Sequence, residues 1–290
     1  MKFHKPNFNS VGNSAAHDFK VKVQESRKSS KDLPFDKYAF YTNAVQSPDT
    51  DVRFLRKVYR DFNKKDPRVL FEDFCGTFQI CCEWVKLNAG FEAHGFDLDT
   101  EPLGYGTTHW FQKLKGHQKD RVQLHEQNVM DERPLKADVV CSLNFSYFIF
   151  KKRAELLSYF KRVRASLNQD GLFVIDLFGG SACFEANEEA TKHSDFTYYW
   201  DQELFDPVAN HAIFHIHFKP KGKKKFEKVF TYDWRMWSIP ELKEILAEAG
   251  FKKSIVYWEG TDKKGEGDGV FKPVTVGEEC QTWIAYIASS

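Results

Sequence analysis

Two acid-bearing segments of the sequence have the residue types and spacing best suited to chemistry. Residues 69–77 read VLFEDFCGT, and residues 95–99, about one βαβ unit further along, read GFDLD. The first contains Glu72 at the end of an apolar run, followed by a tight turn at Gly76. A small residue in such a turn lets the backbone approach a ligand, and an acid ending the next strand, here Asp97, can accept hydrogen bonds from both ribose hydroxyls. The segments therefore predict a pocket for a nucleoside-containing cofactor.

The elements that must position these acids alternate between strand and helix. The strand candidates are Arg68–Phe71, Phe91–Phe96, Arg121–His125, Ala137–Leu143 and Leu172–Leu177. Amphipathic stretches between several of them stop at glycines, Gly90 and Gly171, as helices commonly do. Strands that alternate with helices indicate a parallel sheet with helices on both faces.

Residues 183–237 interrupt this alternation. Segments 196–200, 211–218 and 226–237 have the apolar–polar alternation of strands, and the last two are joined by a Lys- and Gly-containing turn. The pattern predicts an antiparallel insert after the fifth strand. A capped helix from Ser238 and two more strands, Ser254–Trp258 and Thr282–Ile287, follow it. The glycine-rich segment at 265–269 between these strands predicts a hairpin loop.

Composition favours an ordinary globular protein. The chain has 290 residues, 42% of them hydrophobic, and 42 basic against 41 acidic side chains, so it lacks the basic excess typical of nucleic-acid binders. Six cysteines without Cys-x-x-Cys spacing, no leader and no long apolar run predict a cytoplasmic protein with reduced thiols and no membrane span. We expect a flexible basic arm at residues 1–34 and a single domain at 35–290. His215 and His217 share a strand face, but no third ligand follows, so no metal is expected.

The seven strands in this order, together with Glu72 and the Cys-Gly-Thr turn, resemble the class I, Rossmann-like S-adenosylmethionine-dependent methyltransferases over roughly residues 50–290. That family has a Gly-x-Gly-x-Gly turn after its first strand. Here Phe74, Gly76 and Phe78 occupy the three positions. The glycine-poor turn, with WEGT at 258–261, resembles a bacterial branch without an assigned acceptor. The resemblance implies a seven-stranded, mostly parallel, doubly wound sheet with an antiparallel last strand, and S-adenosylmethionine as cofactor.

The resemblance also implies roles for particular residues. Asp97 matches the acid that binds the ribose diol, Leu98 would lie beside the adenine, and Asn128 would reach the adenine amino group. Residues 144–147 follow the fourth strand, where family members line the transferred methyl. The cofactor-binding residues expected on this basis are Glu72, Phe74, Cys75, Gly76, Thr77, Asp97, Leu98, Asn128, Val129 and Asn144.

Methyl transfer by in-line displacement needs alignment and exclusion of water, and a general base only if the acceptor must lose a proton. The candidates for catalysis are Tyr147, Asn144 and Glu259, with Asp233 a further possible base. For the acceptor, expected to be a small molecule, the candidate contacts are Tyr38, Tyr41, Trp200, Tyr232, Arg235 and Trp237. The alternative is that these rings form the insert's own core.

Two other functions stay open at this point. An RNA methyltransferase would use the basic arm and the turn at Lys221–Lys225 to bind phosphates. A non-catalytic protein that binds S-adenosylmethionine, or a scaffold, would keep the fold without turnover. The sequence leaves the oligomeric state open.

Overall fold

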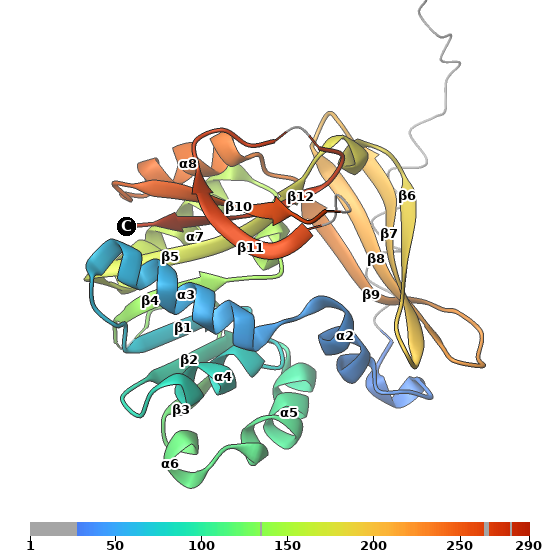
Figure 1. The fold of residues 1–290 in the computed structure, drawn as a ribbon, viewed down its shortest axis with the longest axis horizontal. Helices are drawn as coiled ribbons and strands as arrows, with labels where there is room; N and C mark the ends of the chain where they lie inside the picture. The colour runs from blue at the N-terminus through green and yellow to red at the C-terminus, as the bar shows by residue number, and fades with distance from the viewer. Residues whose placement is uncertain (1–27, 134, 264–266, 279) are drawn as a thin grey trace, which may run out of the picture.

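The computed structural model describes residues 28–133, 135–263, 267–278 and 280–290, which form two β-sheets with helices around the larger one (Figure 1). Most of the predicted N-terminal arm, residues 1–27, lies outside the described residues. Among the described residues, no helix is both long enough and apolar enough to cross a membrane. Cys75, Cys81, Cys82, Cys141 and Cys183 are buried as free thiols, and Cys280 is exposed.

The larger sheet, sheet A, has the strand order β11-β10-β12-β5-β4-β1-β2-β3. Its strands are β1 (Val69–Asp73), β2 (Glu92–Asp97), β3 (Val122–Glu126), β4 (Ala137–Ser142), β5 (Leu167–Gly179), β10 (Ser254–Thr261), β11 (Gly267–Val274) and β12 (Trp283–Ser289). The first five pair in parallel, whereas β12 runs antiparallel to β5. The predicted fold class is confirmed, with one addition: β11 pairs with β10 where only a hairpin loop was expected.

Helices cover both faces of sheet A. They are α2 (Lys37–Val45), α3 (Pro48–Asn63), α4 (Gln79–Leu87), α5 (Thr100–His109), α6 (Gly116–Lys119), α7 (Arg153–Ser166) and α8 (Ile239–Glu248), with short 3₁₀ turns η1 (Ser30–Asp32), η2 (Phe111–Lys113), η3 (Ser146–Ile149) and η4 (Ser181–Phe184). The predicted start of α8 is confirmed: Ser238 and Glu241 form a capping box.

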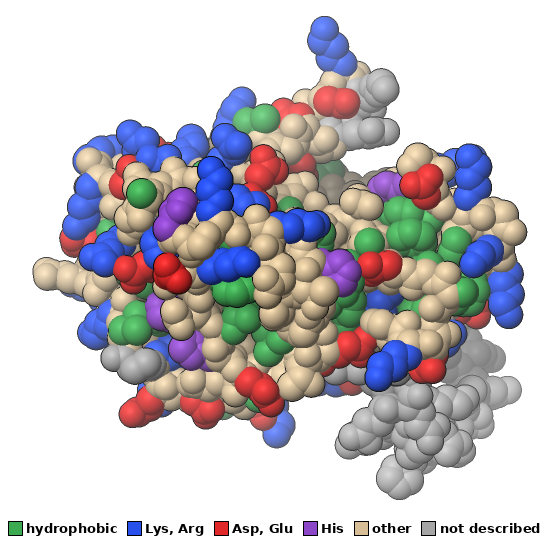
Figure 2. Space-filling view, turned by 90° about the horizontal axis from the view of Figure 1, so that it is seen from below, with side chains coloured by type: hydrophobic (Ala, Val, Ile, Leu, Met, Phe, Trp, Pro, Cys, Tyr) green, Lys and Arg blue, Asp and Glu red, His purple; other side chains and the backbone are tan. Residues whose placement is uncertain are grey.

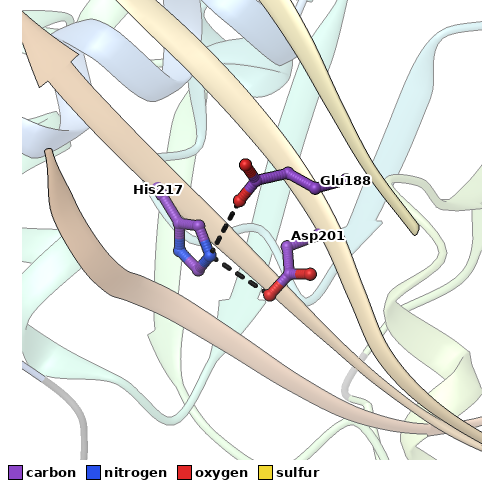
Figure 3. Close-up of side chains that lie close together, drawn as sticks. All are labelled: Glu188, Asp201 and His217. Atoms are coloured by element: carbon purple, nitrogen blue, oxygen red, sulfur yellow. Dashed lines mark hydrogen bonds and ion pairs between the residues drawn. The ribbon is translucent and has the colours of Figure 1, made fainter. Parts of the chain in front are cut away.

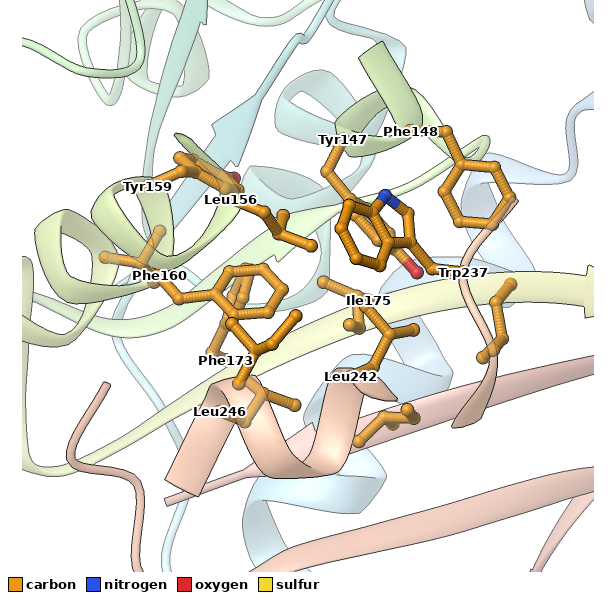
Figure 4. Packing of buried hydrophobic residues seen from close by; sticks show 14 of the residues in the cluster. Tyr147, Phe148, Leu156, Tyr159, Phe160, Phe173, Ile175, Trp237, Leu242 and Leu246 are labelled. Atoms are coloured by element: carbon orange, nitrogen blue, oxygen red, sulfur yellow. The ribbon is translucent and has the colours of Figure 1, made fainter. Parts of the chain in front are cut away.

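The core has a layer on each face of sheet A, and β5 contributes to both. Phe173 and Ile175 point into the layer under α7 and α8 (Figure 4). Leu172 and Val174 point into the layer under α3 and α4. Because successive strand side chains alternate between faces, a strand covered on both sides must be apolar almost throughout. Asp176 is therefore an exception in this strand, and it is also buried.

The predicted insert forms sheet B, an antiparallel sheet of β6 (Asn187–Lys192), β7 (Phe196–Asp206), β8 (His211–Pro220) and β9 (Phe226–Arg235) in that order. Strand β6 was not predicted because its sequence, NEEATK, is polar and mostly exposed and so has no apolar alternation. The segment from Leu33 to α2 packs against sheet B through Leu33, Phe35 and Phe40. Figure 1 shows α2 between the two sheets.

Candidate functional site

A cavity of about 750 Å³ lies at the carboxyl ends of β1, β2 and β4, with α2 and β9 opposite them. This is the edge at which open parallel sheets bind ligands. Every residue predicted to bind the cofactor lines this cavity: Glu72, Phe74, Cys75, Gly76, Thr77, Asp97, Leu98, Asn128, Val129 and Asn144. The structure thus brings together residues that are separated by as many as three strands in the sequence.

The turn after β1 has a left-handed backbone at three positions, of which only one is glycine. Phe74, Gly76 and Phe78 all have left-handed φ angles, of 55°, 50° and 45°. For the two phenylalanines this conformation costs roughly 1–2 kcal/mol each. Packing offsets the cost: Phe78 is fully buried, and the ring of Phe74 contacts that of Tyr159 with centroids 5.8 Å apart. The turn therefore has three left-handed positions although only one of them is glycine.

Asp97 connects this turn to the end of β2. Its Oδ2 accepts a hydrogen bond from the Gly76 N–H at 2.7 Å, and its Oδ1 accepts one from the Asp99 N–H at 2.9 Å. Each carboxylate oxygen keeps further lone pairs for ligand hydroxyls. Asp97 is thereby oriented before any ligand binds, as a ribose-binding acid must be.

Two glycines permit close packing around the turn. A Cβ on Gly106 of α5 would lie 2.1 Å from the Thr77 carbonyl oxygen, and a Cβ on Gly95 would lie 2.8 Å from the Cys75 Sγ. The Cys75 thiol is buried between these elements, and burial raises its pKa well above the usual value. It is a packing residue because a reactive cysteine needs the opposite shift.

Three carboxyl groups lie in a low-dielectric setting, Glu72 in the cavity lining and Asp176 and Asp51 outside it. Burial raises the pKa of Glu72 to about 8, that of Asp176 to about 7 and that of Asp51 to about 6. Glu72 accepts a hydrogen bond from the Cys81 N–H at 2.9 Å, and Asp51 accepts one from the Tyr286 hydroxyl at 3.3 Å. Glu72 therefore holds its proton at neutral pH, and a second negative charge close to Asp97 is avoided.

The wall opposite the turn is largely aromatic. Tyr38 and Tyr41 come from α2, and Phe230, Tyr232 and Trp234 from β9. Tyr41 is hydrogen-bonded to Tyr232, and burial raises the pKa of Tyr41 to about 12, so its hydroxyl stays neutral. Of the predicted acceptor contacts, Tyr38, Tyr41 and Tyr232 therefore line the cavity.

One ionised carboxylate stands on this wall. Burial pushes the pKa of Asp233 upwards, but hydrogen bonds from Lys151 and His211 outweigh this, and its pKa lies below the usual value. Asp233 lines the cavity. It is the member of the predicted set of bases that combines cavity access with a negative charge.

Two predicted catalytic residues lie away from the cavity lining. The ring of Tyr147 is fully buried, because η3 turns it inward, and its hydroxyl donates to the Asp176 carbonyl oxygen at 2.9 Å. Glu259 lies on β10 and accepts a hydrogen bond from the Gly269 N–H at 3.1 Å in the β10–β11 hairpin. Neither geometry supports proton transfer in the cavity.

Three predicted acceptor contacts also lie outside the lining. Trp200 stacks on Phe214 within sheet B, with ring centroids 5.0 Å apart. Arg235 donates to the Glu241 carboxylate at 3.3 Å, and its guanidinium lies 3.8 Å from the ring centroid of Trp237. Trp200 thus packs within the insert, as the alternative expected, whereas Arg235 and Trp237 pack together at the start of α8.

Sequence reasoning missed Lys37 and Glu101, which both line the cavity. The Lys37 ammonium lies 2.9 Å from a Glu101 carboxylate oxygen and 4.8 Å from the ring centroid of Tyr38. Lys37 is 5% exposed, which is rare for a lysine unless it is paired. Nothing in the sequence marks this pair, because the partners come from elements far apart in the chain.

Glu188, Asp201 and His217 are the one group of described side chains with ligand atoms close enough together for a metal ion, within 4.8 Å (Figure 3). The Lys228 N–H donates to His217 Nδ1 at 2.8 Å, which places the proton of a neutral imidazole on Nε2. Nε2 in turn points at Asp201, 3.1 Å away. A protonated nitrogen offers no lone pair to a metal, and the Lys225 ammonium already contacts Glu188. The group is best described as a histidine–carboxylate network.

The fold is that of class I S-adenosylmethionine-dependent methyltransferases. An S-adenosylmethionine-dependent methyltransferase from Clostridium acetobutylicum superposes with a TM-score of 0.56 at 16% identity, covering 95% of this chain and 97% of its own. The sugar N-methyltransferase KedS8 from Streptoalloteichus superposes at 0.59 with 15% identity, covering 100% and 98%. CalS10, an amino pentose methyltransferase from Micromonospora echinaspora, superposes at 0.60 with 15% identity, covering 88% and 98%. Comparison of the sequence with protein-family models and with curated proteins gives no match.

Proposed function

We propose that the protein transfers a methyl group from S-adenosylmethionine to an amine nitrogen of a small molecule. The observation that carries the proposal is that one cavity joins the Asp97 turn to an aromatic wall. Donor and acceptor can therefore be held in line in one enclosed space. The sulfonium supplies the electrophile, so the protein's contribution is orientation and exclusion of water.

The cofactor half of the cavity supports the donor. Asp97 has oriented lone pairs for the ribose diol, and Leu98, 62% exposed, is available to cover the adenine. Asn128 and Val129 follow β3 beside them. An acidic lining also favours S-adenosylmethionine electrostatically, because the sulfonium is a cation.

The acceptor half supports an amine. Leaving aside Glu72, which is neutral, and Asp73, which is paired with the buried Arg133, the lining has four acidic residues, Asp97, Asp99, Glu101 and Asp233, against two basic ones, Lys28 and Lys37. Aromatic faces attract ammonium groups, and here Lys37 already lies over the rings of Tyr38 and Phe230, 4.8 and 5.5 Å from their centroids. A sugar N-methyltransferase and an amino pentose methyltransferase among the structural neighbours also support this class of acceptor.

In the proposed reaction the amine lone pair attacks the methyl carbon, the carbon–sulfur bond breaks, and S-adenosylhomocysteine leaves as a neutral thioether. The incoming amine must be unprotonated. The proton that the ammonium form loses before attack passes to solvent, and Asp233, ionised and in the cavity lining, accepts a hydrogen bond that orients the amine.

Calorimetry and a labelled methyl donor test the proposal. We expect S-adenosylmethionine to bind with a micromolar Kd that Asp97→Asn raises at least tenfold, because one acceptor of Asp97 becomes a donor facing N–H groups. Glu259→Gln, outside the cavity, serves as the matched control and should bind normally. With a panel of amino sugars and other small amines, Asp233→Asn should lower kcat at least tenfold while leaving the Kd of the donor within threefold.

Other outcomes point to other functions. Absence of S-adenosylmethionine binding would refute the proposal. Binding without transfer to any amine, alcohol or RNA would indicate a non-catalytic protein. Transfer to RNA with steep salt dependence would indicate the nucleic-acid enzyme, although acidic and basic side chains both occur across the face shown in Figure 2.

A further inference from the structure

The segment after β4 has an unusual backbone. Asn144 and Phe145 are consecutive residues with left-handed φ angles of 56° and 58°. Neither is glycine, and the left-handed region is disfavoured for phenylalanine more than for asparagine. Two such residues in succession persist only where the surroundings determine their geometry.

The carboxylate of Asp176 holds the backbone of these two residues in place. Its Oδ2 accepts the Asn144 N–H at 2.8 Å, and its Oδ1 accepts the Phe145 N–H at 2.9 Å. The main chain of the same residue takes part as well, because its carbonyl oxygen accepts the Tyr147 hydroxyl at 2.9 Å. Asp176 is 7% exposed in a strand that is otherwise apolar in its central part. A buried acid in such a strand needs a reason, and the two hydrogen bonds that its carboxylate accepts give one.

The hydrogen bonds from Asn144 and Phe145 to Asp176 affect the lining of the cavity. Asn144 lines the cavity, whereas Asp176 does not. Among the described residues no hydrogen bond is seen for the Asn144 side-chain amide, so it is available to a ligand. The direction of this amide follows from the backbone that Asp176 holds.

We infer that Asp176 is a positioning residue, which holds Asn144 at the methyl-donor end of the cavity by accepting two successive backbone N–H groups. The inference rests on the proposed function, since it assumes that S-adenosylmethionine occupies the cavity with its sulfonium near the end of β4. Only a carboxylate offers two acceptors to two adjacent donors. An amide in its place turns one acceptor into a donor that faces a backbone N–H.

The test compares the Kd values of S-adenosylmethionine and S-adenosylhomocysteine by calorimetry in Asp176→Asn, Asn144→Ala and the double variant. These ligands differ only in the methyl and the sulfonium charge, so loss of general packing would weaken both alike. We expect each single variant to raise the Kd of S-adenosylmethionine about tenfold and that of S-adenosylhomocysteine by less than threefold. The double variant should again show about tenfold, because the two residues act through one contact.

The chain contains a matched control. Asp138 on β4 also accepts two successive N–H groups, those of Arg68 and Val69 at 2.7 and 3.0 Å, but at the start of β1 and outside the cavity lining. Asp138→Asn should lower the Tm without changing the ratio of the two Kd values.

Three results would overturn the inference. They are equal weakening of both ligands in Asp176→Asn, a double variant with the summed effect of the singles, and wild-type affinity in Asp176→Asn. If Asp176→Asn does not fold, hydrogen exchange in the wild type decides, because the Asn144 and Phe145 amides must be protected if Asp176 holds them. Failure of the wild type to bind S-adenosylmethionine would instead count against the proposed function.

Discussion

At the scale of single residues, the turn after β1 shows that phenylalanine can occupy left-handed backbone positions beside a glycine. The left-handed φ angles at positions 74, 76 and 78 are a property of the backbone path, and glycine is only the least costly residue to meet it. Here phenylalanine meets it twice, since each ring gains more from burial than the φ angle costs. Residue identity at these positions is therefore a weaker indicator of the turn than the hydrogen bond from Gly76 to Asp97.

Glycine is required elsewhere, on α5, where the helix touches the turn. A Cβ on Gly106 would meet the Thr77 carbonyl oxygen at 2.1 Å, whereas a Cβ on Gly104 would meet nothing within 4 Å. We predict that Gly106→Ala displaces the turn, lowers the Tm and raises the Kd of S-adenosylmethionine about tenfold or more. Gly104→Ala on the same helix should stabilise the protein by about 0.5–1 kcal/mol, because alanine restricts the unfolded chain. Thermal unfolding and calorimetry on both variants decide; equal behaviour would contradict the packing argument.

At the scale of elements, apolar runs predicted the inner strands of sheet A, which are buried on both faces, and period-two alternation predicted the inner strands of sheet B. Both patterns failed at the edges. β11 contains Gly267, Gly269 and Pro273, residues that argue against a strand, but an edge strand tolerates them. β6 is another edge strand, with polar side chains exposed. Edge strands pack few side chains in the core, so their sequences lack the apolar pattern by which a strand is recognised.

The aromatic wall of the cavity shows a further limit of prediction from sequence. Trp200 on β7 pairs with Ile216 of β8, and Tyr232 on β9 pairs with Phe214, two residues away on the same face of sheet B. Of the two aromatic residues, only Tyr232, on the edge strand β9, lines the cavity, whereas Trp200 is half-buried on the inner strand and stacks on Phe214. Which aromatic residue meets a ligand depends on how sheet B docks on sheet A. A period-two pattern in the sequence contains no information on that docking.

Residues 28–45, here called the strap, connect the two sheets over the cavity. On α5, Glu101 accepts hydrogen bonds from the Ser30 N–H at 3.0 Å and from the Lys37 ammonium at 2.9 Å. Burial alone would raise the pKa of Glu101, but these donors lower it to about 2, so the carboxylate stays ionised. At sheet B, Lys28 donates to the Glu227 carbonyl oxygen at 3.2 Å. Glu101 is the residue on which the strap's hold on α5 depends most.

We predict that Glu101→Gln loosens the strap, because it leaves the buried Lys37 ammonium without its counter-ion. The strap should become more sensitive to limited proteolysis, and the Kd of S-adenosylmethionine should rise about three- to tenfold. Glu132→Gln is the matched control, since Glu132 is 89% exposed and pairs with Arg162 outside the cavity lining. Unchanged proteolysis in Glu101→Gln would show that the apolar contacts of the strap suffice to hold it.

At the scale of the whole molecule, the site exists only where three parts of the chain meet: sheet A, the insert and the strap. Carboxyl groups in and near the site make the stability of this assembly depend on pH. Glu72, Asp176 and Asp51 all have pKa values raised by burial, to about 8, 7 and 6. In this pH range the folded protein holds protons that the unfolded chain has released. Stability must therefore fall as pH rises towards the folded pKa values.

Glu72 isolates this effect best, because between pH 7 and 8 the unfolded glutamate is fully ionised while the folded one is still largely protonated. His94, whose pKa burial lowers to about 4, acts in the opposite direction, but its contribution is complete above the unfolded value near 6.5. We predict that the free energy of unfolding falls by about 1 kcal/mol between pH 7 and 8, following the slope for one proton. Glu72→Gln, which imitates the protonated acid, should flatten this dependence. Urea unfolding at both pH values measures it, and a wild-type stability that stays constant or rises would mean that Glu72 is ionised in the folded protein.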